Sequence, residues 1–307
     1  MQAINNTRSN ATHWTPESKT SSAILGICMI LGIPGNVAVI VVISTHMKKK
    51  SYTLRLMLNL AVSDIISLLT MPLWINNQLN GWNLSKGTCR LFIIVLYISI
   101  VSNILTVTLM SVQRYLQVLC PHRWARLGRR REKSLLVSLW ALSFLIAGPY
   151  STIYDVVEEG CEISLSSDAE RLLVLGFETL LCFIVPFFTM AIFYFCLHKK
   201  VNQTAYFRNQ RMTRVVTCIL VVFFVLWIPY HILNLVEIAA IALKLSYQDT
   251  SKRLLDLVWR NRHIVEGFAS FNTCVNPYLY AFSFKSLHQR AKQTKTDNDG
   301  TKCSTEI

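Results

Sequence analysis

Seven long apolar runs follow one another along the chain, and short polar segments separate them. Each run is about 20 or more residues long, which is the length that an α-helix needs to cross the hydrocarbon core of a bilayer. The runs extend over residues 21–44, 53–78, 88–119, 134–154, 169–198, 211–243 and 254–282. The pattern therefore predicts an all-α membrane protein built as a bundle of seven transmembrane helices.

The remaining segments are short, so the bundle at 21–282 is the one large unit that the pattern predicts. Residues 1–20 form a polar N-terminal tail without the apolar core and cleavage site of a signal peptide. Residues 283–293 are amphipathic, which favours a short helix on the inner membrane surface. Residues 294–307 form a polar cytoplasmic tail. No internal repeat is visible, which disfavours a transporter.

Charge orients this predicted bundle. Of the 31 Lys and Arg residues, 21 fall in the segments that face one side of the membrane or at the ends of the runs that border those segments. This is the positive-inside bias of membrane insertion, and it places the N-terminus outside and the C-terminus in the cytoplasm. The net charge of +14 does not indicate nucleic acid as a partner, because the basic clusters lack interleaved aromatic residues.

The outer segments carry two kinds of candidate covalent site. Asn5, Asn10 and Asn83 each begin a sequon for N-glycosylation. Cys89 and Cys161 both lie at outer segment ends, in the oxidising compartment, where they are placed to bridge the third run to the second outer loop.

Polar groups inside the runs are functional candidates, because a charge at bilayer depth costs several kcal/mol unless it is paired or hydrated. Asp64 lies in the middle of the second run. Amide side chains that could meet it are Asn36, Asn103, Asn272 and Asn276. We interpret the set as a polar core that holds a small cation, and the alternative is interhelical hydrogen bonding that fixes the packing.

At the inner end of the third run, Arg114 has two interpretations. It could extend to the membrane interface, as such residues ordinarily do. Alternatively, it exchanges partners among inner-face groups near Tyr115, Tyr194 and Tyr280, which would make it a two-state latch.

One motif in each run stands in the order seen in rhodopsin-like G-protein-coupled receptors, which the chain resembles over nearly its whole length. The motifs are Gly35-Asn36, Leu60–Asp64, Gln113-Arg114-Tyr115, Trp140, Pro186 with Tyr194, Phe223–Trp227–Pro229 and Asn276-Pro277-Tyr278-Leu279-Tyr280, together with the Cys89/Cys161 pair. The resemblance implies a plasma-membrane receptor with a ligand pocket between the outer halves of the third, fifth, sixth and seventh spans.

The resemblance also implies how such a receptor works. Trp227 would act as a toggle above Ile104, Pro186 and Phe223, and Pro277 would belong to the same switch. Asp64, Asn103, Asn272, Asn276 and Trp227 resemble a sodium site. The inner cavity would receive the α subunit of a heterotrimeric G protein, and arrestin is a further expected partner.

One position departs from the family pattern. The family usually has Asp-Arg-Tyr where this chain has Gln113-Arg114-Tyr115. A neutral Gln can hydrogen-bond the guanidinium but lacks the charge-assisted pairing of a carboxylate. The departure therefore suggests either a looser off-state with raised ligand-free signalling, or weak coupling as in an atypical, scavenging receptor.

Within the family, the sixth span and the start of the seventh are similar to leukotriene B4 receptors, so a chemoattractant lipid mediator is the leading ligand. Arg260 or Arg262 could pair with a fatty-acid carboxylate, and Tyr230, His231 and Asn234 could bond its hydroxyls. Each of these assignments has a simpler alternative: the two arginines face water or headgroups, and His231 is a packing residue.

Three other residues favour a different ligand. Glu178, Glu237 and Glu266 make the outer half acidic, which suits an amine or a basic peptide. The remaining alternatives are weak. Nothing indicates an enzyme, because no nucleophile stands beside a base in a known motif, and the seven His residues have no metal-like spacing.

Overall fold

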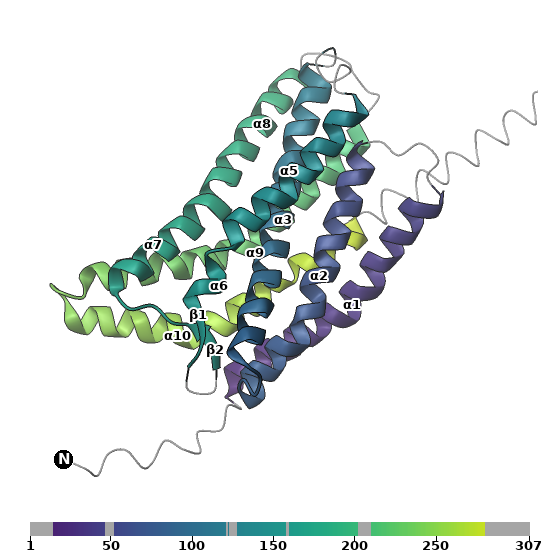
Figure 1. Ribbon diagram of the computed structural model, residues 1–307. Coiled ribbons are helices and arrows are strands. Elements are labelled where there is room, and N and C mark those ends of the chain that lie inside the picture. Colours follow the sequence, from purple (N-terminus) through teal and green to yellow (C-terminus); the bar gives the residue numbers. More distant parts are fainter. Residues whose placement is uncertain are drawn as a thin grey trace, which may run out of the picture.

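The apolar runs fold into long helices, because only structures that satisfy their own backbone hydrogen bonds can cross hydrocarbon. In a computed structural model of the protein, these helices lie side by side as one bundle (Figure 1). The structure describes residues 15–46, 52–120, 122, 128–157, 160–201 and 210–279. The predicted surface helix at 283–293, the tail at 294–307 and the sequons at Asn5 and Asn10 lie outside these residues.

Eight long or medium helices build the bundle. They are α1 (Pro16–His46), α2 (Tyr52–Asn80), α3 (Lys86–Leu119), α5 (Arg129–Ala147), α7 (Asp168–Thr179), α8 (Val185–Val201), α9 (Gln210–Leu243) and α10 (Gln248–Ser270). Six stretches of described helix are long and apolar enough to cross a membrane. Every helix named above except α10 belongs to one of these stretches, and α7 and α8 share one of them. Charged residues such as Lys252, Arg253 and Asp256 fill the first turns of α10, which packs between α1 and α9 and closes the bundle.

The first helix begins earlier than predicted. The polar tail was expected to reach residue 20, but α1 starts at Pro16. Thr15 explains the difference, because its hydroxyl accepts a hydrogen bond of 3.1 Å from the Ser18 amide and so caps the first turn. Proline at the first helical position needs no hydrogen-bond partner for its nitrogen.

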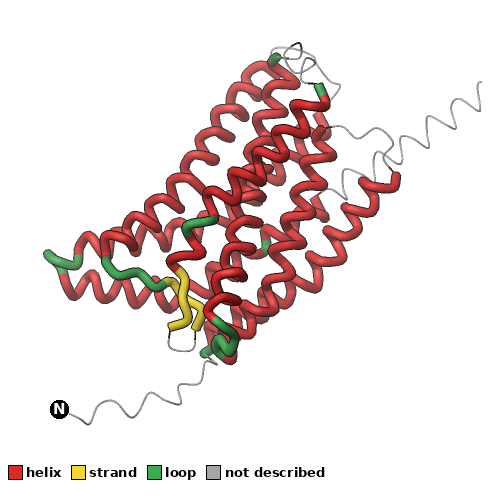
Figure 2. Tube along the Cα trace, in the orientation of Figure 1, coloured by secondary structure: helices red, strands yellow, loops and turns green. Residues whose placement is uncertain are grey.

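The fourth run does not form the single helix predicted over 134–154. Helix α5 ends at Ala147, and a short helix, α6 (Tyr150–Ile153), follows Pro149. Gly148 keeps helical backbone angles, but Pro149 has no amide that could donate to the carbonyl of Leu145, so the regular helix ends there. The predicted outer loop then folds as an antiparallel hairpin, with β1 (Tyr154–Val157) paired to β2 (Gly160–Ile163), at one end of the bundle (Figure 2).

A disulfide and an ion pair are among the contacts that fasten this hairpin to α3. Cys89 at the start of α3 forms a disulfide with Cys161 on β2, as predicted. Lys86 donates a short hydrogen bond to Asp155 on β1, and this contact holds the pKa of the Asp155 carboxyl below its ordinary value. The ion pair therefore persists above that lowered pKa and is lost as the pH falls through it. Asn83, the remaining sequon, lies exposed on the loop before α3.

The fifth run is a helix with an irregular turn. A π-helical turn, η1 (Leu180–Ile184), joins α7 to α8, and the Val185 amide bonds to the Leu180 carbonyl five residues back. Pro186 follows immediately and cannot donate a backbone hydrogen bond. The wider turn takes up the distortion that the proline imposes, as insertions of this kind do elsewhere.

The seventh run is interrupted as well. Helix α10 ends at Ser270, Phe271 forms a turn, and helix resumes over residues 272–279. Pro277 lacks the amide that would bond to the carbonyl of Thr273. The side chain of Asn36 on α1 donates to that carbonyl at 2.9 Å instead. Asn36 therefore satisfies a backbone group that the proline leaves free.

Loss of the disulfide should destabilise the protein. Replacing both Cys89 and Cys161 with Ser opens a large loop, which in soluble proteins costs about 4 kcal/mol; we expect less here, because the bilayer already confines the helices. Thermal melting of the detergent-purified protein should show a clear drop in melting temperature. Cys218, an exposed free cysteine, gives the control, and an equal drop on Cys218→Ser would contradict the prediction.

Candidate functional site

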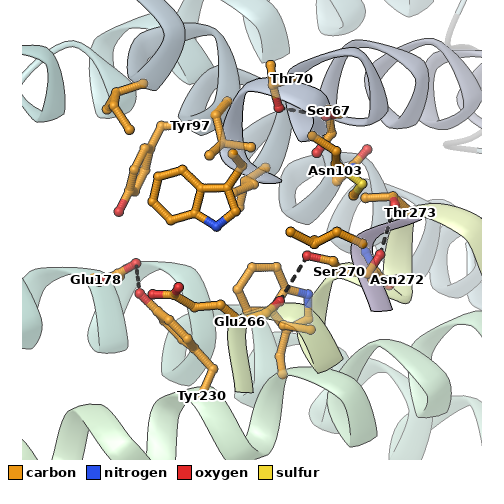
Figure 3. Close-up of a pocket in the computed structure, with 18 of the residues that line it drawn as sticks. Ser67, Thr70, Tyr97, Asn103, Glu178, Tyr230, Glu266, Ser270, Asn272 and Thr273 are labelled. Carbon is orange, nitrogen blue, oxygen red and sulfur yellow. Dashed lines mark hydrogen bonds between the residues drawn. The ribbon is translucent and has the colours of Figure 1, made fainter. Parts of the chain in front are cut away.

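A cavity opens among the outer halves of the helices. Its volume, counted with the open space at its mouth, is about 930 Å³, within the range of small-molecule sites. Glu178, Tyr230 and Glu266 lie on one side of it, and Ser67 and Thr70 lie on the other (Figure 3). Five aromatic side chains also line the cavity, and they are Trp74, Tyr97, Tyr154, Trp227 and Tyr230.

The charged groups that line the cavity are acidic. Glu178 accepts a hydrogen bond of 2.9 Å from the Tyr230 hydroxyl (Figure 3). Glu266 lies 3.6 Å from the ring of His263. Among the described residues that line the cavity, none is a Lys, Arg or His. The cavity is thus an aromatic chamber with two carboxylates in its wall.

Just outside this lining, one carboxylate joins three helices. Glu237 on α9 is fully buried and accepts short hydrogen bonds from Arg171 on α7 and from Arg262 on α10. Arg262 also donates to Asn234 at 2.7 Å and lies over the Tyr230 ring. Arg171 stacks on Trp259. Two guanidinium groups share one carboxylate, so this cluster carries one surplus positive charge next to the cavity.

Sequence reasoning missed Arg171, Trp74 and Tyr97. Arg171 and Glu237 are 66 residues apart in the chain, and no local pattern pairs them. In the sequence, Tyr97 is one of many aromatic residues that lie in the apolar runs. Only the fold shows that its ring stacks on Tyr150 and that its hydroxyl lies 3.2 Å from that of Tyr154. Tyr154 is the first residue of β1, and its side chain lines the cavity.

Two predicted ligand residues lie elsewhere. The side chain of Arg260 is 78% exposed and reaches Glu17 at 3.6 Å, because it projects from the outer side of α10. His231 is buried and stacks on Phe183 with ring centroids 4.5 Å apart. Neither lines the cavity. For both residues, the simpler interpretation, a surface arginine and a packing histidine, describes their surroundings.

Below the cavity, Asp64 is fully buried in the polar core that the sequence predicted. Its two carboxylate oxygens accept hydrogen bonds from Asn103 at 2.8 Å and from Asn276 at 3.0 Å. Asn272 contributes to the floor of the cavity. Asn36 is the exception, because its amide is committed to the carbonyls of Gly32 and Thr273. The core therefore links α2, α3 and the helix at 272–279.

Trp227 joins the cavity to the packed core beneath it. Its ring lines the cavity and lies 6.1 Å from that of Phe223, which is 1% exposed. Phe223 and Ile104 belong to one hydrophobic cluster. The indole Nε1 of Trp227 is buried and has no hydrogen-bond partner among the described residues. A ligand that moves this ring would act directly on the core packing.

At the inner end of α3, Gln113 does not bond directly to Arg114. Both side chains donate to the hydroxyl oxygen of Thr53 on α2, from Gln113 at 2.7 Å and from Arg114 at 3.0 Å. Arg114 also donates to Gln117 at 3.2 Å. Tyr115 packs on Phe193 instead. The side chain of Tyr194 and all of Tyr280 lie outside the described part of the chain.

Comparison with known proteins identifies the class of this fold. A family model described as 7 transmembrane receptor (rhodopsin family) matches residues 35–280. The chain belongs to this family and is a G-protein-coupled receptor, which confirms the predicted seven-helix fold.

The similar proteins include receptors for two kinds of ligand. Leukotriene B4 receptor 1 of Homo sapiens is 31% identical over 84% of this chain and 75% of its own length. C-C chemokine receptor type 6 of Homo sapiens is 28% identical over 83% and 70%. Atypical chemokine receptor 3 of Homo sapiens is 28% identical over 86% and 75%. The chain is therefore related to leukotriene B4 and chemokine receptors.

The Glu237 cluster should contribute strongly to stability. Glu237→Ala leaves two guanidinium groups without their carboxylate, and we expect a loss near the lower end of the roughly 3–5 kcal/mol seen when one partner of a buried pair is removed. Lys244→Ala is the matched control. It breaks the pair between Asp168 on α7 and Lys244 in the turn that follows α9, where both side chains are half exposed, so its effect should stay below about 1 kcal/mol. Equal melting temperatures for the two variants would contradict the prediction.

Proposed function

We propose that this receptor binds an amphipathic lipid chemoattractant of the leukotriene B4 type in its outer cavity. The receptor then activates heterotrimeric G proteins, with arrestin as a further partner. It lies in the plasma membrane with its N-terminus outside and its C-terminus in the cytoplasm. The observation that carries the proposal is the position of the Arg171–Glu237–Arg262 cluster, which has one more guanidinium than carboxylate, beside a mostly aromatic and aliphatic cavity.

The cluster could hold the carboxylate of such a lipid. Arg262 is only partly committed, since its hydrogen bonds to described residues go to Asn234 and Glu237, and a guanidinium carries five N–H donors. The acyl chain would lie along the aromatic walls of the cavity. Glu178 and Tyr230, already bonded to each other, could bond hydroxyl groups along the chain. Similarity to leukotriene B4 receptor 1 supports the same ligand class.

A second candidate ligand is an amine or a basic peptide. Its support is the lining itself, in which Glu178 and Glu266 are the charged groups and five aromatic rings face the cavity. Carboxylates with aromatic faces attract cations. Similarity to chemokine receptors is compatible with this candidate.

Leukotriene B4 binding separates the two candidates. Labelled leukotriene B4 should bind membranes that contain the receptor, and Arg262→Ala should weaken binding by at least about tenfold, because it removes a partly desolvated cation. Arg260→Ala is the matched control and should bind as the parent does, since Arg260 points to solvent. The same test uses the primary amide of leukotriene B4, which has no carboxylate charge. Arg262→Ala should weaken binding of this amide much less than it weakens binding of the free acid.

Other outcomes decide between the candidates. No saturable leukotriene B4 binding to the parent would remove the lipid proposal. Binding of a cationic ligand that Glu178→Gln weakens would then establish the amine or peptide candidate. An equal loss for the acid and its amide would show that Arg262 acts through the fold and not through the carboxylate.

The Asp64 core is proposed as a sodium site. Its donor set fits a hard cation, because carboxylate, amide and hydroxyl oxygens gather there: Ser63 donates to Asn103 at 2.6 Å, and Asn103 donates to Asp64. A bound sodium ion would supply the positive charge that the buried carboxylate otherwise lacks.

Sodium should therefore stabilise the parent but not Asp64→Asn. We expect the melting temperature of the purified receptor to rise when potassium is replaced by sodium at constant ionic strength. In Asp64→Asn, which keeps the shape of the side chain and removes its charge, the rise should disappear. An equal rise in both proteins would rule out a site at Asp64.

A further inference from the structure

We propose that Thr53 is the positioning residue that holds Arg114 in this receptor, in place of the acid that related receptors usually carry at position 113. The inference deepens the proposed function, because it names a regulator of the inner-face switch, and it rests on the proposed coupling to G proteins.

The geometry places one oxygen at the centre of the switch. The Thr53 hydroxyl accepts from Gln113 and from Arg114 at 2.7 and 3.0 Å. All three residues are buried, with relative exposures of 3% for Thr53, 0% for Gln113 and 5% for Arg114. A hydroxyl oxygen has two lone pairs, so these two donors use its whole accepting capacity.

The charge of Arg114 is poorly compensated at this position. Among the described residues, no carboxylate oxygen lies within 4 Å of its guanidinium, and its Nε has no partner. The second acceptor, Gln117, is also neutral. Gln113 turns its NH₂ group toward Thr53, and its own Oε1 is left unpaired. Thr53 is therefore the only acceptor on another described helix that is bonded to Arg114.

The helix that carries Thr53 is itself fixed. Arg55, two residues further along α2, forms a 2.8 Å salt bridge with Glu132 in the first turn of α5, and both side chains are largely buried. The first turn of α2 thus connects α3 to α5. Thr53 therefore stays in place when Arg114 exchanges it for another partner. This exchange breaks hydrogen bonds to neutral groups and does not break an ion pair. Release should be easier than from a carboxylate, because a neutral acceptor binds a guanidinium less strongly.

A double-mutant cycle tests this role. Thr53→Val removes the acceptor at nearly constant volume, and Thr53→Ser keeps the hydroxyl as the matched control. Each variant is made in the parent and in Gln113→Asp, where the new carboxylate can pair with Arg114. The two readouts are ligand-free nucleotide exchange on purified G protein and the melting temperature of the purified receptor.

In the parent, Thr53→Val should raise ligand-free exchange by about threefold to tenfold, as coupling between contacting residues allows. It should also lower the melting temperature, and Thr53→Ser should change both readouts little. In Gln113→Asp, ligand-free exchange should fall, and Thr53→Val should lose most of its effect.

Equal effects of Thr53→Val in both backgrounds would overturn the proposal, because they would assign Thr53 a packing role alone. If Thr53→Val is too unstable to purify, Thr53→Ala in the same cycle gives the same comparison. If no receptor variant stimulates any G protein, the proposed coupling fails. The melting temperatures then still decide the role of Thr53, because the dependence on residue 113 must appear there.

Discussion

The cost of leaving a polar group unpaired in hydrocarbon governs where the contacts that tie the helices of this receptor together lie. Pro277 removes a backbone donor, and Asn36 reaches across from α1 to satisfy the carbonyl of Thr273. The same requirement places two amides on Asp64 and two guanidinium groups on Glu237. Each of these contacts joins two different helices, so satisfying polar groups and assembling the bundle are one process.

The inner and outer ends of the bundle meet this constraint in different ways. At the outer end, charged groups form ion pairs, and Glu237 links α7, α9 and α10 into a rigid frame beside the cavity. At the inner end, Arg114 meets neutral oxygen atoms of Thr53 and Gln117. The outer frame is therefore suited to hold its shape while a ligand enters, and the inner contacts are suited to change partners. Trp227 and Phe223 lie between these two regions.

Much of the fold could be predicted from the sequence, because the length of an apolar run is a local property. The seven runs, the Cys89–Cys161 pairing and the meeting of Asp64 with Asn103 and Asn276 all follow from single segments or from one family pattern. The ends of the helices were less predictable. Pro149 ends α5 early and the next segment forms a hairpin, although the same run is apolar to Tyr154. The direction of a side chain on a helix was the least predictable feature: Arg260 was expected to contact the ligand but points to solvent, whereas Arg171 was not expected beside the cavity but pairs with Glu237 there.

The hairpin makes one wall residue of the cavity depend on strand register. Tyr154 opens β1 opposite Ile163, and successive residues of a strand point to opposite faces. A shift of β1 by one residue against β2 would exchange the faces and present a neighbour of Tyr154 to the cavity. The disulfide would keep the loop anchored to α3 during such a change. The register of this hairpin, which follows the span at Arg130–Ile153, can thus alter what the receptor recognises without a substitution in any membrane-spanning helix.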